Sequence, residues 1–528
     1  MIKHLLLFLF GFIHVVGHSQ DGYKINPAID ILHYSFEIEI SDENDQIKGV
    51  TTLSTQLKSS TNVIVLDLAN QKSGKGMTVL DVIVNDLPAE FSHQNDQISI
   101  SSSTLNAPGV HKISVSYQGI PADGLIISKN KYGERTFFGD NWPNRAHHWL
   151  PCIDHPSDKA TMEFSITAPS HYMVIANGKK IEESYLDNNK KLTHWKESVP
   201  IATKVAVFGA SRFATFENGM LKNVPISSWV YPQNRTEGFK DYNYAVEIME
   251  YFDGQIGDYS YEKLANVQSK TRYGGMENAS NIFYFENSVN GKGDHEPLVA
   301  HEIAHQWFGN SVTEKNWHHV WLSEGFATYL THLYMESKYG EDSLKSRMEL
   351  DRKTIIDFEK KRYTPIIDST EFDYMTLLND NTYEKGGWVL HMLRFEIGIE
   401  TFKTGMQTYY SRYQNKNANS RDFQRVMEEV SGKDLNTFFY QWLRTPGHPE
   451  LDIKWTYNKS KKSVDLKVTQ KQQNLFKFTL EIAIDKNNNT SAHQLKVEER
   501  SQKFSIPVEI RPESITFDPF THLLYSKN

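Results

Sequence analysis

The sequence contains almost no cysteine: Cys152 is the only one among 528 residues. A single thiol cannot form an intramolecular disulfide, so the fold must be stabilised by burial of apolar side chains and not by cross-links. Basic runs are lacking too, because the 57 lysine and arginine residues are scattered and are outnumbered by 65 aspartate and glutamate residues. This distribution gives no indication of a nucleic-acid partner.

Long apolar runs are also lacking, apart from a short one at the N-terminus. Lys3 precedes the apolar residues 5–12, and small residues follow at 17–19, which is the pattern of a secretory signal. A short buried helix or membrane anchor is the alternative, but the run is too short to span the ~30 Å of bilayer hydrocarbon. We therefore expect residues 1–19 to be a signal peptide, with an exported, periplasmic or secreted, product that has no integral membrane segment after cleavage.

The length is sufficient for about three domains. Stretches such as 34–40, 62–68 and 110–117 alternate or are β-branched, which predicts strands and an N-terminal all-β domain over 20–213. Helical spacing dominates 214–447, and 448–528 return to short alternating segments. We predict a multidomain α+β protein with a mainly helical central domain and a small C-terminal β-sandwich.

Several helix limits can be predicted within the central part. Residues 242–252 and 296–309 have helical spacing, and a helix through 328–339 should end at Gly340. Asp422 is a plausible cap for a helix over 422–430. A breaker at Thr445-Pro446-Gly447 predicts a boundary.

The segment His301-Glu302-Ile303-Ala304-His305 places two histidines at i and i+4 of one predicted helix. Both imidazoles can then reach the same ion, and Glu302 lies beside them as a general base. Glu324 follows nineteen residues after His305 on the next predicted helix. Although any single glutamate is more often a surface residue, this spacing is typical of gluzincins, and two imidazoles with one carboxylate suit zinc. We predict one Zn²⁺ per chain, held by His301, His305 and Glu324.

A second motif, Gly274-Gly275-Met276-Glu277-Asn278, precedes the histidine pair. With the zinc motif, it resembles the aminopeptidase N family of gluzincins, which have a thermolysin-like catalytic domain. The resemblance implies that Gly274, Gly275, Met276, Glu277 and Asn278 bind substrate, whereas a strand edge is the plainer interpretation. A carboxylate such as Glu277 near a metal can pair with a substrate's α-amine and restrict cleavage to the first peptide bond.

Two further segments extend the resemblance over nearly the whole chain. Tyr383-Glu384-Lys385-Gly386 is similar to a family segment, which implies that Tyr383 donates a hydrogen bond to the developing oxyanion. The loop around Cys152 resembles the family's Pro-Cys-x-Asp-x-Pro loop, which implies a structural cysteine.

Two departures from the family pattern concern substrate access and the amine site. Where many members have a second amine-binding group, this chain has Asp140 and Asn141, either of which could substitute. The chain also resembles a short form that lacks the C-terminal helical domain.

The remaining histidines have weaker claims as ligands. His318 and His319 are expected in a strand-like link, His147 and His148 in a loop, and His332 and His391 are expected to pack on helices or face solvent.

Together these features predict a zinc-dependent aminopeptidase that hydrolyses the N-terminal bond of peptides with a free N-terminus, with Glu302 and Tyr383 as catalytic residues. A zinc endopeptidase with the same metal site and a catalytically silent peptide-binding scaffold are the alternatives. Glu277 favours the first over the second, and the presence of every ligand and of Glu302 argues against the third.

Overall fold

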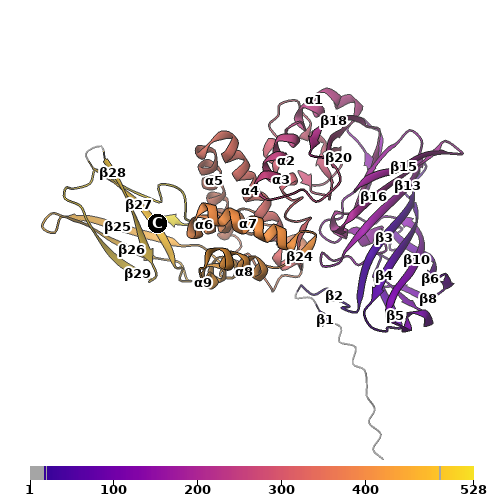
Figure 1. The fold of residues 1–528 in the computed structure, drawn as a ribbon, viewed down its shortest axis with the longest axis horizontal. Coiled ribbons are helices and arrows are strands. Elements are labelled where there is room, and N and C mark those ends of the chain that lie inside the picture. Colours follow the sequence, from indigo (N-terminus) through magenta and orange to yellow (C-terminus); the bar gives the residue numbers. More distant parts are fainter. Residues whose placement is uncertain (1–16, 19–20, 487–488, 528) are drawn as a thin grey trace, which may run out of the picture.

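The computed structural model describes residues 17–18, 21–486 and 489–527. Three parts follow one another along the long axis of the molecule: an N-terminal β part, a helical middle part, and a second β part that contains the C-terminus (Figure 1). The order agrees with the predicted fold class. The predicted signal peptide falls outside the described residues except for β1 (Gly17–His18), which pairs with β2 (Lys24–Ile25).

An eight-stranded sheet is the main element of the N-terminal part. In β13 (Lys159–Pro169), buried and half-buried side chains alternate without interruption, so one face of the strand packs on the core. The sheet order is β15-β16-β13-β3-β4-β10-β6-β7, and its other strands are β3 (Ile29–Glu39), β4 (Ile47–Leu57), β6 (Gly76–Val84), β7 (Leu87–Pro88), β10 (Gly109–Ile120), β15 (Lys179–Leu186) and β16 (Lys190–Ala202). Two smaller sheets complete this part. One contains β11 (Leu125–Lys129), β12 (Arg135–Gly139), β17 (Phe208–Ser211) and β14 (Met173–Ala176). The other contains β5 (Val63–Asp67), β9 (Gln97–Ser101) and β8 (Glu90–Gln94).

The middle part begins with a five-stranded sheet in the order β18-β19-β20-β22-β21. Its strands are β18 (Ala214–Leu221), β19 (Val224–Val230), β20 (Leu264–Ser269), β22 (Asn281–Phe285) and β21 (Gly275–Met276). In the described chain β21 pairs only with β22, and in antiparallel fashion. The other edge of β21 can therefore pair with an extended peptide.

Nine helices make up most of the middle part of the described chain. They are α1 (Arg235–Asp241), α2 (Tyr244–Gln255), α3 (Glu296–Ala304), α4 (Trp321–Tyr339), α5 (Glu341–Glu359), α6 (Gly386–Ile397), α7 (Ile399–Tyr413), α8 (Ser420–Ser431) and α9 (Asn436–Arg444). The α4 helix stops before Gly340, as predicted.

Three local predictions in the middle part were wrong. The α3 helix ends at Ala304 and not at Gly309, because the chain folds back and the Asn310 N–H donates to the His305 carbonyl over 3.0 Å. The cap of α8 is Asn419, and Asp422 completes a capping box from the third helical position. The supposed strand-like link is a 3₁₀ turn at Trp317–His319.

The C-terminal part consists of two small sheets. One contains β29 (Ser501–Pro507), β26 (Ser463–Gln470), β25 (Glu450–Asn458) and β31 (Ser526–Lys527), and the other β28 (Asn489–Val497), β27 (Phe478–Lys486) and β30 (Ser514–Phe517). Leu466 and Val468 of the first sheet and Leu480 of the second are buried in one core. This arrangement is the predicted β-sandwich.

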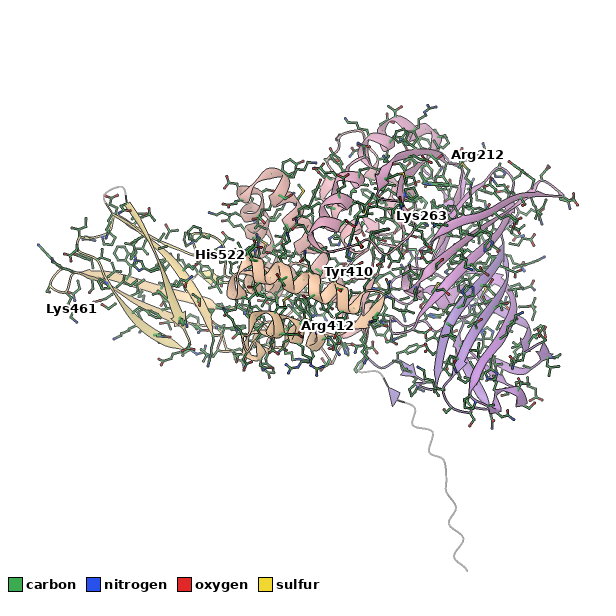
Figure 2. The ribbon with its side chains drawn as sticks, in the orientation of Figure 1. Arg212, Lys263, Tyr410, Arg412, Lys461 and His522 are labelled. Atoms are coloured by element: carbon green, nitrogen blue, oxygen red, sulfur yellow. The ribbon has the colours of Figure 1, made fainter. Side chains whose placement is uncertain are left out.

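Buried polar contacts join the N-terminal and middle parts close to the second motif. The Asn177 side-chain amide donates to the Ala279 carbonyl at 2.6 Å, and the Ser280 hydroxyl donates to Glu197 at 3.2 Å. Lys263, which lies on the side of the middle part that faces the N-terminal sheets (Figure 2), donates to the Ser280 carbonyl at 3.0 Å. The N-terminal part therefore positions the segment that follows Glu277.

Among the described residues, we find no helix that combines the length and apolar character needed to cross a membrane.

Candidate metal centre

Two adjacent helices bring the three predicted ligands together. His301 lies on α3, His305 caps its C-terminal end with helical backbone angles, and Glu324 lies in the first turn of α4. The two histidine Nε2 atoms are 3.1 Å apart, and the Glu324 Oε2 atom lies 3.2 Å from His305 Nε2 and 3.6 Å from His301 Nε2. Ligands at about 2.0–2.1 Å from a tetrahedral zinc ion are separated by roughly 3.3 Å, so these three atoms have the spacing of one face of a zinc tetrahedron.

The orientation of His305 depends on the backbone that follows it. Its Nδ1 atom lies 3.2 Å from the Phe308 carbonyl and 3.1 Å from the Ser323 hydroxyl. When Nδ1–H donates to this carbonyl, Nε2 carries the lone pair that a metal ligand needs. The tight turn after Ala304, which the sequence did not predict, therefore orients a ligand.

Glu302 lies on α3 beside the ligands, lines the same cavity as they do and is 4 % exposed. Gly275 is required at this point, because a Cβ atom there would come within 2.2 Å of the Glu302 Oε1 atom. Burial raises the pKa of Glu302 well above its ordinary value; His305 opposes this shift, and Glu277 and Glu324 add to it. A carboxylate of this kind is suited to accept and return a proton.

Glu277 follows the edge strand β21 and faces the ligands. Its backbone carbonyl accepts hydrogen bonds from the side chains of Gln306, at 2.9 Å, and Asn310, at 2.5 Å. Its Oε1 atom is buried and has no hydrogen-bond partner among the described residues. Ligand atoms of Glu277, Glu302 and His305 lie within 4.8 Å of one another. Burial is the largest cause that raises the pKa of Glu277, followed by His305, which lowers it, and Glu324, which raises it.

Tyr383 reaches the same centre from a π-helical turn, Asn381–Lys385, that leads into α6. Its ring stacks on that of His301 with centroids 6.1 Å apart and planes inclined by 13°. Burial, and then the negative charges of Glu324, Glu277 and Glu302, raises the pKa of Tyr383 well above its ordinary value. The phenol therefore stays protonated and can donate a hydrogen bond.

A close approach of two backbones places this tyrosine. A Cβ atom on Gly325, the residue after Glu324, would lie 2.8 Å from the Gly386 Cα atom. Only glycines allow α4 and the start of α6 to touch here. Lys385, next to Gly386, is fully buried and pairs with Glu359 at 2.6 Å, which anchors the turn.

A cavity of about 500 Å³ contains these groups. Of the five residues that were predicted to bind substrate, Gly274, Gly275, Met276 and Glu277 line it, whereas Asn278 is fully buried and does not. The motifs had not indicated several other lining residues, which are Trp142, Tyr273, Pro297, Leu298, Thr328, Thr331, His332, Arg347 and Leu378. The motifs also gave no indication of Gln306 and Asn310, whose side chains hold the Glu277 carbonyl. Both follow His305 so closely in the sequence that a role at the site could have been suspected.

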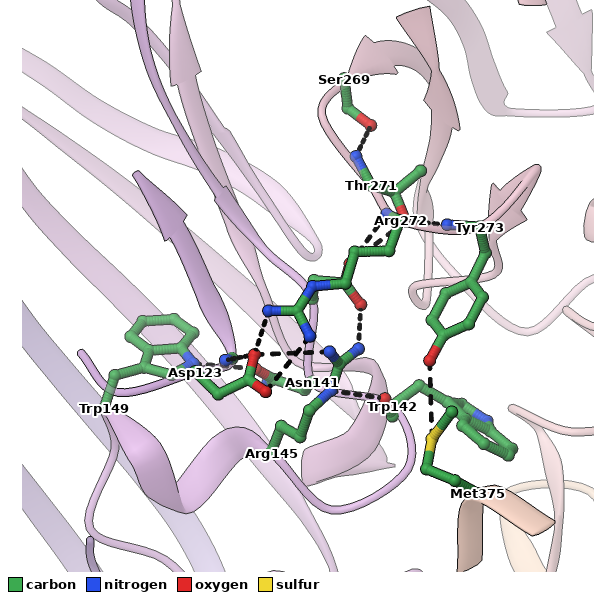
Figure 3. Close-up of polar contacts among 12 residues, drawn as sticks. Asp123, Asn141, Trp142, Arg145, Trp149, Ser269, Thr271, Arg272, Tyr273 and Met375 are labelled. Carbon is green, nitrogen blue, oxygen red and sulfur yellow. Dashed lines mark hydrogen bonds and ion pairs between the residues drawn. The ribbon is translucent and has the colours of Figure 1, made fainter. Parts of the chain in front are cut away.

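Asp140 and Asn141 do not provide a second amine-binding group. The Asp140 carboxylate accepts hydrogen bonds from Arg145 and from the backbone N–H of Arg272, and the Asn141 side chain contacts Trp149 and two backbone carbonyls. Figure 3 shows Arg145 beside Asp123, Asn141 and Trp142, with Tyr273 directed away toward Met375. Both candidates are fully buried in a structural network next to the cavity.

The remaining histidines, with one exception, lie in structural contacts. His147 pairs with Asp154 at 2.7 Å, His318 contacts the Glu371 carbonyl and His391 the Thr521 carbonyl. His332 packs between helices, one of its two expected roles, because it pairs with Asp351 of α5, but it also lines the cavity, which was not predicted.

Cys152 is fully buried in the N-terminal core. Burial raises the pKa of its thiol well above the ordinary value, so the thiol stays protonated. This state fits a structural residue and not a nucleophile.

Comparisons with known proteins agree with this arrangement. Three family models match: the peptidase M1 N-terminal domain over residues 31–205, the peptidase family M1 domain over 240–442, and a TAF2 Ig-like domain over 446–514. Aminopeptidase A of Gloydius brevicauda is 26% identical over 94% of this chain and 53% of its own length, and glutamyl aminopeptidase of Mus musculus is 25% identical over 84% and 50%.

A solved structure shows the same fold. Aminopeptidase A of Legionella pneumophila, in complex with aspartic acid, superposes with a TM-score of 0.82 at 18% identity, over 96% of this chain and 60% of that one. This chain spans about half the length of the curated relatives that it matches. Because two peptidase M1 models match, over residues 31–205 and 240–442, we conclude that the chain belongs to peptidase family M1.

Proposed function

We propose that this chain is a zinc-dependent aminopeptidase, with one zinc ion held by His301, His305 and Glu324. The observation that carries the proposal is the Glu277 carboxylate, which faces the ligand triad and keeps one buried oxygen without a hydrogen-bond partner in the described chain. A buried, unpartnered carboxylate is costly unless a ligand supplies the partner. The ammonium group of a peptide's free N-terminus has the right charge and hydrogen-bonding capacity.

Glu277, Glu302 and Tyr383 have separate roles in the hydrolysis. With the amine at Glu277 and the backbone paired along β21, the first carbonyl of the peptide lies at the ligand triad. A zinc ion there supplies Lewis acidity, which polarises a carbonyl and acidifies water. Glu302 accepts the proton of the attacking water and returns it to the departing amine. Tyr383 donates its hydroxyl hydrogen to the oxygen of the first carbonyl as negative charge develops there.

The amine side of the cavity favours an apolar first residue. Trp142 and Met276 belong to the N-terminal hydrophobic core, and Leu378 packs against it. Two arginines lie near this wall, but both are paired: Arg145 with Asp140, and Arg272 with Asp123. The names of the glutamyl aminopeptidase relatives suggest an acidic first residue, but no arginine beside this wall is free to bind one in the described chain.

Comparison of leucyl and N-acetyl-leucyl p-nitroanilide, with and without a chelator, tests the proposal. We expect hydrolysis of the unblocked substrate only, loss of activity on chelation, and recovery with one equivalent of zinc. Equal cleavage of the blocked compound would indicate an endopeptidase, and a zinc-loaded protein inert toward a panel of unblocked aminoacyl amides would indicate a silent scaffold. Glu277→Gln should raise KM for the unblocked substrate while zinc content stays the same.

We also propose that the protein is exported, on the basis of the signal-like pattern in residues 1–19. Mass spectrometry of the N-terminus after expression of the full chain tests this. A mature N-terminus near Gln20 supports export, and an intact Met1 in the cytoplasmic fraction contradicts it.

A further inference from the structure

An arginine without a partner lies in the wall of the cavity. Arg347, on α5, lines the cavity together with Thr328, Thr331 and His332 of α4. It is half-buried, and it makes no hydrogen bond, ion pair or ring contact within the described chain. Since a guanidinium carries five donors in a planar fork, this position can receive a carboxylate.

The usual partner for such an arginine is present but is already engaged. Asp351 lies one turn after Arg347 on α5, at the spacing at which helical ion pairs form. Its carboxylate instead accepts a hydrogen bond from His332 Nε2 at 2.7 Å, which links α5 to α4. This pair fixes the position of the wall on which the unpaired Arg347 lies.

Arg347 lines the cavity with residues of α4 that follow Glu324, and α4 runs from Glu324 toward the N-terminal end of α3, where the Tyr334 hydroxyl donates to Glu296 at 2.8 Å. Gln306 and Asn310 hold Glu277 at the C-terminal end of α3, whereas Pro297 and Leu298, at the N-terminal end of α3, line the other side. A peptide held by its amine at Glu277 therefore extends past the ligand triad toward the N-terminal end of α3, and its leaving group lies on that side.

The distance along α4 from Glu324 to the wall indicates which residue of the peptide Arg347 can reach. Thr331 follows Glu324 by seven residues, and at 1.5 Å per residue the wall lies about 10 Å beyond the ligand. An extended peptide advances about 3.3 Å per residue, and the arginine side chain itself spans several ångströms of the distance that is left between the peptide and the wall. The second residue of the substrate is thus the one whose carboxylate can meet the guanidinium.

We propose that Arg347 binds a carboxylate on the second residue of the peptide, and so gives the enzyme a preference for peptides that are acidic on the leaving-group side. This inference rests on the proposed aminopeptidase function. The carboxylate can come from an acidic side chain or, in a dipeptide, from the free C-terminus, since a guanidinium binds both in the same bidentate manner.

Two pairs of substrates separate these sources. Leucyl-aspartyl amide and leucyl-asparaginyl amide differ by one side-chain charge, and leucyl-glycine and leucyl-glycinamide differ by the terminal charge. The readout is the ratio of kcat/KM within each pair, because that ratio does not depend on the fraction of folded enzyme. The variants are Arg347→Gln and Arg347→Glu, with Arg511→Gln as a control, because Arg511 is likewise unpaired in the described chain but is exposed and lies in the C-terminal part.

We expect the wild type to prefer the charged member of at least one pair by about tenfold, the scale of one charge-assisted hydrogen bond. Arg347→Gln should abolish this preference, Arg347→Glu should reverse it, and Arg511→Gln should leave it unchanged. Loss of the preference in the aspartyl pair alone identifies the acidic side chain as the source of the carboxylate. Loss of the preference in the glycine pair alone identifies the free C-terminus as the source. Wild-type ratios retained by both Arg347 variants overturn the inference but leave the aminopeptidase function intact, whereas no cleavage of any of the four substrates by zinc-loaded wild type contradicts both.

Discussion

Two clusters of charged side chains, one in the wall network around Arg145 and one at the ligand triad, differ in how completely their polar atoms are paired. In the network of Asp123, Asp140, Arg145 and Arg272, both carboxylates accept hydrogen bonds from guanidinium groups. Although burial raises the pKa of Asp123, the hydrogen bond and charge of Arg272 and the charge of Arg145 lower it overall. This network needs no further ligand.

The second cluster contains three buried carboxylates and two imidazoles but no arginine or lysine. Glu277 and Glu302 have raised pKa values, and the pKa of His305 rises to about 9 because the three carboxylates together outweigh the effect of its burial. A divalent cation and a substrate ammonium would supply the charge that this cluster lacks. The comparison indicates that unpaired polar atoms, and not burial or charge alone, distinguish the reactive cluster from the structural one.

The largest effect on turnover should follow from removal of the proton acceptor in the reactive cluster. Glu302→Gln keeps the shape of the side chain but cannot accept a proton, so kcat should fall about 10³-fold. Zinc content, measured by atomic emission, should remain at one per chain because Glu302 is not a ligand. Substantial turnover by this variant would remove Glu302 from the mechanism.

Loss of the hydroxyl of Tyr383 should have the next largest effect. Tyr383→Phe should lower kcat about 10²-fold, with a smaller change in KM, because the hydrogen bond is strongest in the transition state. Tyr409→Phe is the matched control, since the Tyr409 hydroxyl is also buried but lies away from the cavity and has no partner in the described chain. Equal losses in the two variants would show that Tyr383 only packs.

A single added methyl group tests the packing around the proton acceptor. In Gly275→Ala the new Cβ would lie 2.2 Å from Glu302, so Glu302 or β21 must shift, and kcat should fall about tenfold with zinc retained. Gly274→Ala is the control, because its Cβ meets only Leu298, at 3.6 Å. If Gly275→Ala has wild-type kinetics, the close approach has no catalytic consequence.

The paired cluster should respond in stability and not in chemistry. Asp140→Asn removes the buried negative charge that pairs with Arg145, so the free energy of unfolding should fall by roughly 3–5 kcal/mol. Turnover per folded molecule should be nearly unchanged, because Asp140 does not line the cavity. Chemical denaturation and active-site titration measure the two quantities. A large loss of kcat in the folded variant would show that the network does more than support the wall.

Local patterns predicted those features that depend on neighbours along the chain. The i, i+4 spacing of His301 and His305 is realised because the backbone remains helical through His305. Period-two alternation located β3 and β10, and Gly340 marked the end of α4. Such features depend on helix and strand geometry, which a few residues determine. The end of α3 and the cap of α8 were wrong, because tertiary contacts and side-chain hydrogen bonds decide element limits.

The composition and the motif spacings alone determined that this chain forms no intramolecular disulfide, that it combines β and helical parts, and that it can form a His-His-Glu metal site. Only the tertiary structure decided which polar groups are left without partners. Asp140 and Arg347 have no distinguishing sequence signal, yet Asp140 is paired with Arg145, whereas Arg347 has no partner within the described chain. Pairing depends on residues that are distant along the chain, so no local pattern could reveal it.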